Sequence, residues 1–334
     1  MKVVFLGTPQ IAVPSLEFLI KKEEVEVLAV VSQPDKPVGR GHKICTTPVC
    51  CAAREYNISI YKPASIRKDT ELIDKLKQLE PDFFVTFAFG QILSQEVIDI
   101  PKYGCVNLHA SLLPKYRGAN PIQAPILNGD KKTGITTMMT ELALDSGPIV
   151  KQQEIDITEN MTSLDLMQII ANESPELIYE SIKGLYEGTI TPTPQNENEV
   201  TIAPKVKKED GHIDWSEPAE VIHNKVRGLK PWPGTFTYIR GTCVKITETR
   251  LNSEKNIKDG NLGEIVGKIN NGISVVTGDG ILVITKLQPA CKPQQEAVSW
   301  YNGARIQKGE GFETMDSDKA AACECKCEVE ENKQ

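Results

Sequence analysis

Residues 1–31 read MKVVFLGTPQIAVPSLEFLIKKEEVEVLAVV, in which two apolar runs flank a helical pattern. Val3–Leu6 is a short apolar run that stops at Gly-Thr-Pro. Val25–Val31 is an apolar, β-branched run typical of a strand that is buried on both faces. Between them, Val13–Lys22 carries apolar residues at the spacing of a helix. We therefore expect a β-α-β unit with a right-handed crossover.

The same alternation of patterns continues along the first half of the chain. Further strands are predicted at Ile58–Tyr61, Phe83–Phe87 and Cys105–Leu108. Helices are predicted at Thr46–Tyr56, Asp69–Leu79 and Ala119–Leu127. Two β-rich segments follow, Gly134–Leu142 and Ile149–Ile157, and then a long helical stretch, Thr162–Leu185, which Pro175 weakens. Repeated β-then-α order predicts an α/β fold with an open parallel sheet and helices on both faces.

The pattern changes after the long helical stretch. Residues 188–204 hold three prolines among Gln, Asn and Glu, which is typical of an extended linker. A short helix, Val221–Val226, precedes short alternating runs separated by Gly and Asn turns: Thr235–Ile239, Val244–Leu251, Gly263–Ile269, Ile273–Thr277 and Ile281–Leu287. These runs predict a small antiparallel barrel. We therefore place a first domain at 1–189, a linker at 190–205, a second domain at 206–315 and a disordered tail at 316–334.

Composition narrows the class of protein. The 334 residues are enough for about two domains, and 40% apolar with 25% charged residues excludes collagen, coiled coil and wholesale disorder. The net charge of -7 argues against nucleic-acid binding, but residues 201–315 alone carry 16 basic and 13 acidic residues. No apolar run is as long as a signal peptide or a membrane span, so no membrane association and a cytoplasmic location are expected.

Cysteines and histidines give little support for a metal site. In a reducing cytosol the nine cysteines are expected to be mostly free thiols, and the four histidines are too dispersed to suggest zinc. Cys323, Cys325 and Cys327 form a C-x-C-x-C run that could bind a soft metal, although a disordered extension is the favoured interpretation. The sequence also lacks two glycine-rich nucleotide-binding motifs. No G-x-G-x-x-G follows the first strand, and no G-x-x-x-x-G-K-[ST] occurs anywhere.

The most informative segment is 104–121, GCVNLHASLLPKYRGANP. Asn107 and His109 are two residues apart on a predicted strand, so both project from one face at its carboxyl end, where open α/β sheets bind ligands. An Asn amide can stabilise a developing oxyanion, and a His can accept a proton near neutral pH. Asp145 is a loop candidate to orient the imidazole. The pattern alone fits equally well a His hydrogen-bonded at a sheet edge and an Asn that closes a turn.

Two loops and a basic segment are further candidates. Ser111–Pro114 and Phe89–Leu93 are apolar loops that could form the wall of a pocket for a flat, pterin-like ring, or could simply pack in the core. The segment 33–48, QPDKPVGRGHKICTTP, carries Lys36, Arg40 and Lys43 against a single acid, Asp35. It is expected to be a long loop, either a solvated surface loop or a basic arm for a phosphate backbone.

The run NLHASLLP at 107–114, with YRG at 116–118, resembles the signature of the 10-formyltetrahydrofolate-dependent formyltransferases. Five further segments are similar to the methionyl-tRNA-specific branch of that family: VVFLGTP (3–9), QPDKPVGRG (33–41), HIDWS (212–216), KPWPGT (230–235) and TGDGILVITKLQPA (277–290). The resemblance runs from about residue 2 to Phe312 and leaves out the cysteine-containing tail.

The resemblance implies a Rossmann-like formyltransferase domain followed by an OB-like, tRNA-binding barrel. It implies that formyl passes from 10-formyltetrahydrofolate to the methionine amine of initiator methionyl-tRNA, in a monomer without a metal. The implied catalytic residues are Asn107, His109 and Asp145. The implied folate contacts are Ser111, Leu112, Leu113 and Pro114, beside the loop Phe89, Gly90, Gln91, Ile92 and Leu93. The implied tRNA contacts are Arg40, Lys36 and Lys43.

Three alternatives remain at this point. The formyl acceptor could be a small amine such as a sugar nucleotide, or the acceptor could be water, which would make the protein a hydrolase. A folate- or tRNA-binding module without catalysis is the third alternative, which the presence of Asn107, His109 and Asp145 disfavours.

Overall fold

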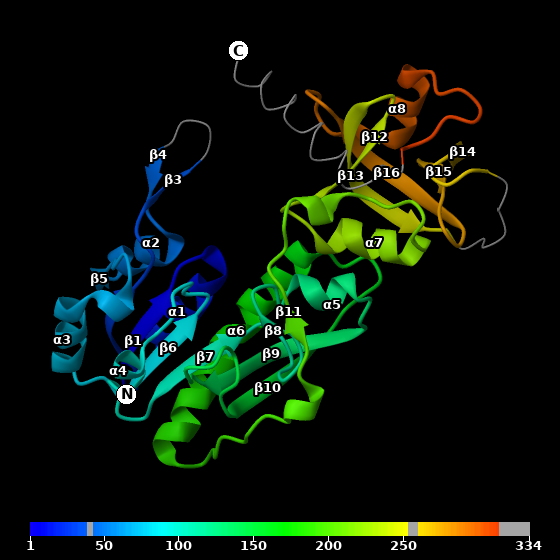
Figure 1. Ribbon diagram of the computed structural model, residues 1–334. Helices are drawn as coiled ribbons and strands as arrows, with labels where there is room; N and C mark the ends of the chain where they lie inside the picture. The colour runs from blue at the N-terminus through cyan, green and yellow to red at the C-terminus, as the bar shows by residue number, and fades with distance from the viewer. Residues whose placement is uncertain (39–42, 253–259, 314–334) are drawn as a thin grey trace. The chain divides into compact units, whose positions relative to one another are not determined.

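The structure is a computed structural model that describes residues 1–38, 43–252 and 260–313. The chain forms two compact units (Figure 1). The N-terminal unit comprises Met1–Ile122, Lys132–Asp156 and Asp165–Pro204. The C-terminal unit comprises Gln123–Lys131, Ile157–Leu164 and the described residues from Lys205 onward. Each unit is thus assembled from segments that are separated in the sequence.

The N-terminal unit is built on a seven-stranded sheet of order β10-β9-β7-β6-β1-β2-β5. Its strands are β1 (Lys2–Gly7), β2 (Glu26–Val31), β5 (Ser59–Tyr61), β6 (Phe83–Phe87), β7 (Cys105–His109), β9 (Lys132–Met139) and β10 (Ile149–Asp156). The five strands from β5 to β7 are parallel, as predicted, whereas β9 pairs antiparallel with both β7 and β10. The sheet is therefore mixed rather than purely parallel.

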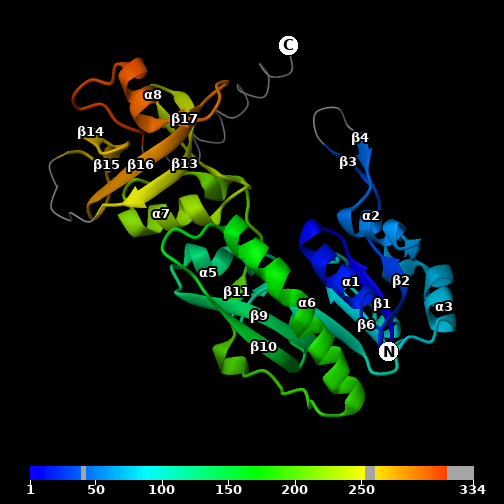
Figure 2. The same cartoon turned by 180° about the vertical axis from the view of Figure 1, so that it is seen from behind.

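Helices cover both faces of this sheet, as predicted. They are α1 (Val13–Ile20), α2 (Pro48–Glu55), α3 (Thr70–Gln78), α4 (Gln95–Ile98) and α6 (Ser163–Glu187), with short 3-10 turns at η1 (Gln10–Ala12), η2 (Ile66–Lys68) and η3 (Glu197–Glu199). Val4 and Leu6 of β1 pack with the apolar residues of α3 and α4. On the other face α1 and α6 lie together, where the ring of Phe18 meets that of Tyr179 (Figure 2).

Helix α6 continues through Pro175 without a break, contrary to the expected weakening. Proline removes one backbone donor, but the inner face of α6 is buried through Ile170, Leu177 and Ile182. The hydroxyl of Ser174 donates to the carbonyl of Ile170 in the turn before the proline. Tertiary packing therefore outweighs the local helix propensity.

Three other predictions need correction. The expected loop 33–48 contains a hairpin of β3 (Lys36–Val38) and β4 (Lys43–Cys45). The helix predicted from Ala119 begins only at Gln123 (α5, Gln123–Leu127), because the N–H of Ala119 donates to the carbonyl of Ala203 instead. The predicted linker is also not merely extended, since its β11 (Ile202–Ala203) pairs with β8 (Arg117–Gly118).

The C-terminal unit contains the predicted antiparallel strands. They are β12 (Thr235–Ile239), β13 (Thr242–Leu251), β14 (Ile265–Ile269), β15 (Gly272–Val276), β16 (Ile281–Pro289) and the short β17 (Gln295–Glu296). The helices of this unit are α5, α7 (Ala219–Gly228) and α8 (Ala297–Ala304), with η4 (Glu209–Gly211); α8 and β17 had no counterpart among the predicted elements.

The segment 310–313 links the two edges of this second sheet. Glu313 donates its N–H to Tyr238 on β12, and Ile265 at the start of β14 donates to Glu310. The sheet thus closes on itself, as in a barrel. Phe312 stacks between Trp215 and Trp300 in the core, with centroid distances of 5.4 and 5.9 Å.

No helix in the described part of the chain is long and apolar enough to span a membrane.

Candidate active site

The carboxyl ends of β1, β6 and β7 meet at one edge of the N-terminal sheet. From β1 the chain first extends the sheet through β2 and β5, and then returns to add β6 and β7 on the other side of β1. Such a reversal of strand order leaves a crevice at the carboxyl ends of the strands, where α/β proteins bind ligands. The loop Phe89–Leu93 follows β6, and Asn107 and His109 lie on β7. The predicted residues are therefore at the edge where a ligand is expected.

The side chain of Asn107 is oriented by the neighbouring strand. Thr86 lies opposite Asn107 in the parallel pairing of β6 and β7. The Thr86 hydroxyl donates to Oδ1 of Asn107 at 2.7 Å. Because Oδ1 is the acceptor in this bond, the amide NH₂ group remains as a donor toward the open side of the site.

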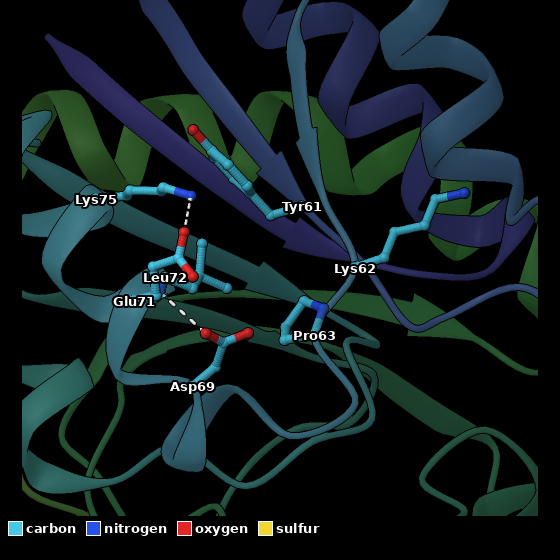
Figure 3. Close-up of a pocket in the computed structure, with 7 residues that line it drawn as sticks. All are labelled: Tyr61, Lys62, Pro63, Asp69, Glu71, Leu72 and Lys75. Carbon is cyan, nitrogen blue, oxygen red and sulfur yellow. Dashed lines mark hydrogen bonds and ion pairs between the residues drawn. The ribbon is translucent and has the colours of Figure 1, made fainter.

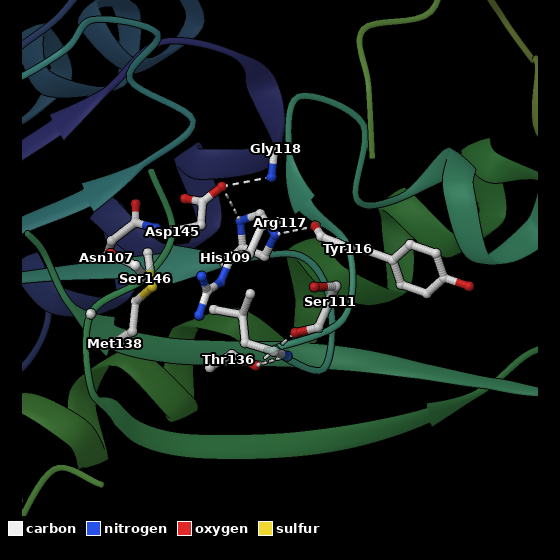
Figure 4. Close-up of polar contacts among 12 residues, drawn as sticks. Asn107, His109, Ser111, Tyr116, Arg117, Gly118, Thr136, Met138, Asp145 and Ser146 are labelled. Atoms are coloured by element: carbon white, nitrogen blue, oxygen red, sulfur yellow. Dashed lines mark hydrogen bonds and ion pairs between the residues drawn. The ribbon is translucent and has the colours of Figure 1, made fainter. Parts of the chain in front are cut away.

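His109 is buried, with 6% of its side chain exposed. Its Nε2 lies 2.8 Å from the carbonyl oxygen of Tyr116, and its Nδ1 lies 3.6 Å from Oδ2 of Asp145 (Figure 4). A carbonyl can only accept, so Nε2 carries the hydrogen and Nδ1 of the neutral ring is the basic nitrogen. A proton taken up at Nδ1 would face a carboxylate. The arrangement therefore suits a group that gains and loses a proton.

Asp145 is brought to His109 by the loop after β9. The residue has φ +51°, a left-handed conformation that non-glycine residues adopt infrequently. Its Oδ2 accepts a hydrogen bond from the N–H of Gly118 at 2.8 Å. Figure 4 draws the Asp145 carboxylate between the amide of Asn107 and the imidazole of His109. A carboxylate, an imidazole and a primary amide thus face one region.

Gly118 has to be a glycine in this arrangement. It has φ +117°, and a Cβ atom there would lie 2.7 Å from the carbonyl oxygen of Ala203. The close approach of β8 and β11 therefore requires a residue without a side chain. The result is a backbone donor held against the carboxylate of Asp145.

The segment Ser111–Pro114 is fixed from its inner side. The hydroxyl of Thr136 on β9 donates to the carbonyl of Ser111 and accepts from the N–H of Leu113. Gln152 on β10 donates to the carbonyl of Leu113. The backbone of this segment, which contains the cis Leu113-Pro114 peptide, is therefore held by side chains of β9 and β10.

The loop Phe89–Leu93 is anchored at some residues and open at others. Phe89 and Leu93 are buried in the core, and Gln91 bonds to the backbone of Pro63 and Ile66. Ile92 is 68% exposed, and its backbone makes no hydrogen bond within the described residues. The loop thus combines apolar surface with open backbone groups, which suits a flat heterocycle.

The basic residues of the β3–β4 hairpin are only partly described. Lys36 is exposed on β3 and Lys43 lies on β4, but Arg40 lies outside the described residues. Asp35 is paired with Lys62 at 2.6 Å, and this hydrogen bond lowers the pKa of the Asp35 carboxyl. The single acid of the segment is thus already neutralised.

Two other features of the N-terminal unit do not form a site. A pocket beside the end of β5 has charged side chains that already have partners: Lys75 pairs with Glu71, Lys62 pairs with Asp35, and Asp69 caps α3 (Figure 3). Cys105, on the same strand as His109, is fully buried, which raises the pKa of its thiol to about 12 and makes it an unreactive thiol.

Within the described ranges no group of three or more His, Cys, Asp and Glu side chains is placed to hold a metal ion. Cys323, Cys325 and Cys327 lie outside those ranges.

Comparison with known proteins identifies the family. Residues 1–182 match the family described as formyl transferase, and residues 205–305 match the formyl transferase C-terminal domain. The methionyl-tRNA formyltransferase of Clostridium perfringens is 47% identical over 309 residues, which are 92% of this chain and 99% of the relative. That of Clostridioides difficile is 43% identical over the same shares. The chain belongs to the methionyl-tRNA formyltransferase family.

The fold is also that of solved formyltransferases. An N-formyltransferase from Helicobacter canadensis, solved with folinic acid and dTDP-3-aminofucose, has a TM-score of 0.64 at 22% identity. The match covers 85% of this chain and 98% of that one. At this identity the likeness concerns the fold alone.

In this formyltransferase the structure brings His109 and Asp145 into contact and places Asn107 on the same strand. Sequence reasoning missed the groups that orient them, namely the Thr86 hydroxyl, the Tyr116 carbonyl, the Gly118 amide and the side chain of Gln195, which contacts the Asp145 loop. No sequence signal identifies these partners, because each contact depends on strand register or on a distant segment.

Proposed function

We propose that the protein transfers the formyl group of 10-formyltetrahydrofolate to the α-amine of methionine on initiator methionyl-tRNA, giving the N-formylmethionyl-tRNA used in translation initiation. The observation that carries the proposal is the pair His109 and Asp145 beside Asn107, in a chain related over 92% of its length to methionyl-tRNA formyltransferases. In this reaction the amine nitrogen forms a bond to the formyl carbon. The bond from that carbon to N10 breaks, and one proton moves from the amine to N10.

Asn107 would act on the charge that develops during the transfer. Its NH₂ group is left free because Thr86 occupies its oxygen. An amide donor fixed in this way can stabilise negative charge on the formyl oxygen, and loss of such a donor costs about 2.7–4 kcal/mol in other acyl-transfer enzymes.

His109 and Asp145 would handle the proton of the attacking amine. The Tyr116 carbonyl fixes the tautomer of His109, so that Nδ1 is the basic atom beside Asp145. Asp145 would orient the imidazole, stabilise its charged form and pass protons through water. Either group could take the first proton from the amine.

The formyl donor would lie between two loops. Ser111, Leu112, Leu113 and Pro114 would provide the fixed wall, and Gly90, whose carbonyl accepts from Gln33, and the exposed Ile92 would provide the outer part of the loop after β6. Phe89, Gln91 and Leu93 would support that loop from the core and from Pro63. The donor itself supplies an activated formyl group bound to nitrogen.

Charge favours tRNA as the acceptor. Residues 201–315 carry 16 basic and 13 acidic residues, although the whole chain is acidic. Lys36 on β3, Lys43 on β4 and Arg40, which lies between them in the sequence, would contact the phosphate backbone. We propose that the protein acts as a monomer in the cytoplasm, because the charged tRNA is made there.

The test is an assay of the purified chain with 10-formyltetrahydrofolate and methionyl initiator tRNA, in which the N-formylmethionyl-tRNA formed is measured. A dTDP-amino sugar and a reaction without acceptor serve as parallel arms. Formylmethionine as the main product supports the proposal. Faster formylation of the sugar, or release of formate without acceptor, would assign the protein to one of the two rival reactions.

A further inference from the structure

We infer that Gln195, in the segment of the N-terminal unit that follows α6, is a positioning residue that holds the Asp145 loop in place for catalysis. The inference rests on the proposed function of Asp145. It concerns a part of the chain that the sequence predicts to be a linker.

The side-chain NH₂ group of Gln195 donates hydrogen bonds to the loop that carries Asp145. Its Nε2 lies 2.8 Å from the carbonyl oxygen of Asp145 and 2.8 Å from that of Gly147. These two carbonyls lie on either side of Ser146. One NH₂ group therefore holds both ends of the turn that presents the Asp145 carboxylate.

Gln195 is itself held by a buried guanidinium. Its Oε1 accepts from Nε and Nη2 of Arg117 at 3.0 and 2.8 Å. Arg117 is only 8% exposed, and its charge is balanced by Glu197, whose carboxylate oxygen lies 2.8 Å from Nη2. Because the Arg117 guanidinium can only donate, the amide oxygen of Gln195 must face Arg117 and its NH₂ group must face the loop.

Asp145 needs this support because its conformation is unfavourable in isolation. The residue lies in the left-handed region and is 11% exposed. Gly118, the residue after Arg117, holds the carboxylate, and Gln195 holds the main chain of the same residue. The side chain of Asp145 is thus held by Gly118 on β8, and its backbone is held by Gln195, in the segment that leads to β11.

The first experiment is the substitution Gln195→Glu in the full chain. Glutamate keeps the oxygen that faces Arg117 but replaces the donor with an oxygen that repels the two carbonyls. We expect kcat for methionyl-tRNA formylation to fall roughly 10- to 100-fold, with KM for tRNA and folate changed less than about 2-fold. Gln168→Glu, on the exposed face of α6, is the matched control and should retain the kcat of the unmodified chain.

The second experiment does not depend on activity. Amide hydrogen exchange, measured residue by residue by NMR, should show faster exchange at Gly118 in Gln195→Glu, because the Asp145 carboxylate no longer accepts its hydrogen bond. The amides of Arg117 and Ala119 donate to the carbonyls of Thr201 and Ala203, so they should stay protected. Their protection distinguishes a displaced loop from an unfolded one.

The outcomes separate the inference from the proposed function. Unchanged kcat and unchanged Gly118 exchange in Gln195→Glu would overturn the inference, whatever the substrate is. Loss of protection at Gly118, Arg117 and Ala119 together would also overturn it, since the role would then be general stability. An unmodified chain that does not formylate methionyl-tRNA would contradict the proposed function, while the exchange data would still decide the role of Gln195.

Discussion

His109 and His223 lie in different units and have almost the same surroundings. They are 6% and 3% exposed. In each, Nε2 faces a main-chain carbonyl, that of Tyr116 at 2.8 Å for His109 and that of Glu159 at 3.2 Å for His223. The difference is at Nδ1, where His109 faces the Asp145 carboxylate at 3.6 Å and His223 faces the hydroxyl of Thr249 at 2.9 Å.

This difference distinguishes a histidine suited to proton transfer from one that only holds the fold. A hydroxyl can donate to Nδ1 of a neutral ring, so His223 is fully satisfied without a charge. Burial lowers the pKa of His223, and the nearby Arg227 adds to this effect. At His109, in contrast, Nδ1 faces a carboxylate, which can only accept a hydrogen bond. Burial and hydrogen bonding alone therefore do not identify a catalytic histidine.

The largest effect is expected from His109→Ala. Turnover of methionyl-tRNA should fall by about 100-fold or more, because the proposed general acid–base group is lost, while tRNA binding persists. Steady-state kinetics and a filter-binding assay measure the two quantities. Near-normal turnover would remove the distinction between the two histidines.

Asp145→Asn tests the feature that separates the two sites. Asparagine keeps the size of the side chain and an oxygen for Gly118 but removes the charge beside His109. We expect kcat to fall roughly 10- to 100-fold with little change in unfolding free energy. If kcat matched that of the unmodified chain, the carboxylate would have no more catalytic significance than the hydroxyl of Thr249.

His223→Ala should affect stability rather than catalysis. The substitution leaves the Thr249 hydroxyl and the Glu159 carbonyl without their partner in a buried place, which costs about 2 kcal/mol of unfolding free energy. Denaturant unfolding measures this loss, and kcat below the unfolding transition should stay within about 3-fold. A loss of kcat as large as that of His109→Ala would contradict the comparison.

The smallest effect is a pH dependence of stability that comes from His223. Its pKa is lower in the folded chain than the value of about 6.5 in an unfolded one. As the pH falls below about 6.5, the unfolded chain takes up a proton that the folded chain does not. Unfolding free energy should therefore decrease by up to about 1.4 kcal/mol per pH unit from this group.

Denaturant unfolding between pH 7 and pH 5.5 measures this slope, above the range in which most carboxylates titrate. His223→Gln, which keeps an amide donor and acceptor without a titratable ring, should give a shallower slope. His212 is also half-buried with a lowered pKa, so part of the slope should remain in that variant. An unchanged slope would mean that His223 does not titrate on unfolding.

Regular elements with strong periodicity were predicted well. The strands at Phe83–Phe87 and Thr235–Ile239 have the predicted bounds, and the helix predicted at Asp69–Leu79 is α3, with Asp69 as its cap. These elements follow from local patterns of apolar residues and caps. The hairpin β3–β4 and the pairing of β8 with β11 were not predicted, because short polar strands carry no such pattern.

The amino-acid sequence by itself determined the strongly periodic strands and helices, the family, and the motif that carries Asn107 and His109, with Asp145 as its candidate partner. These are local properties, since apolar spacing and neighbouring residues specify them. Only the tertiary structure decided which groups act on that motif. Thr86, Gly118 and Gln195 come from different segments, and strand register and a returning segment bring them together. Contacts between distant segments depend on the folded chain, so no local pattern specifies them.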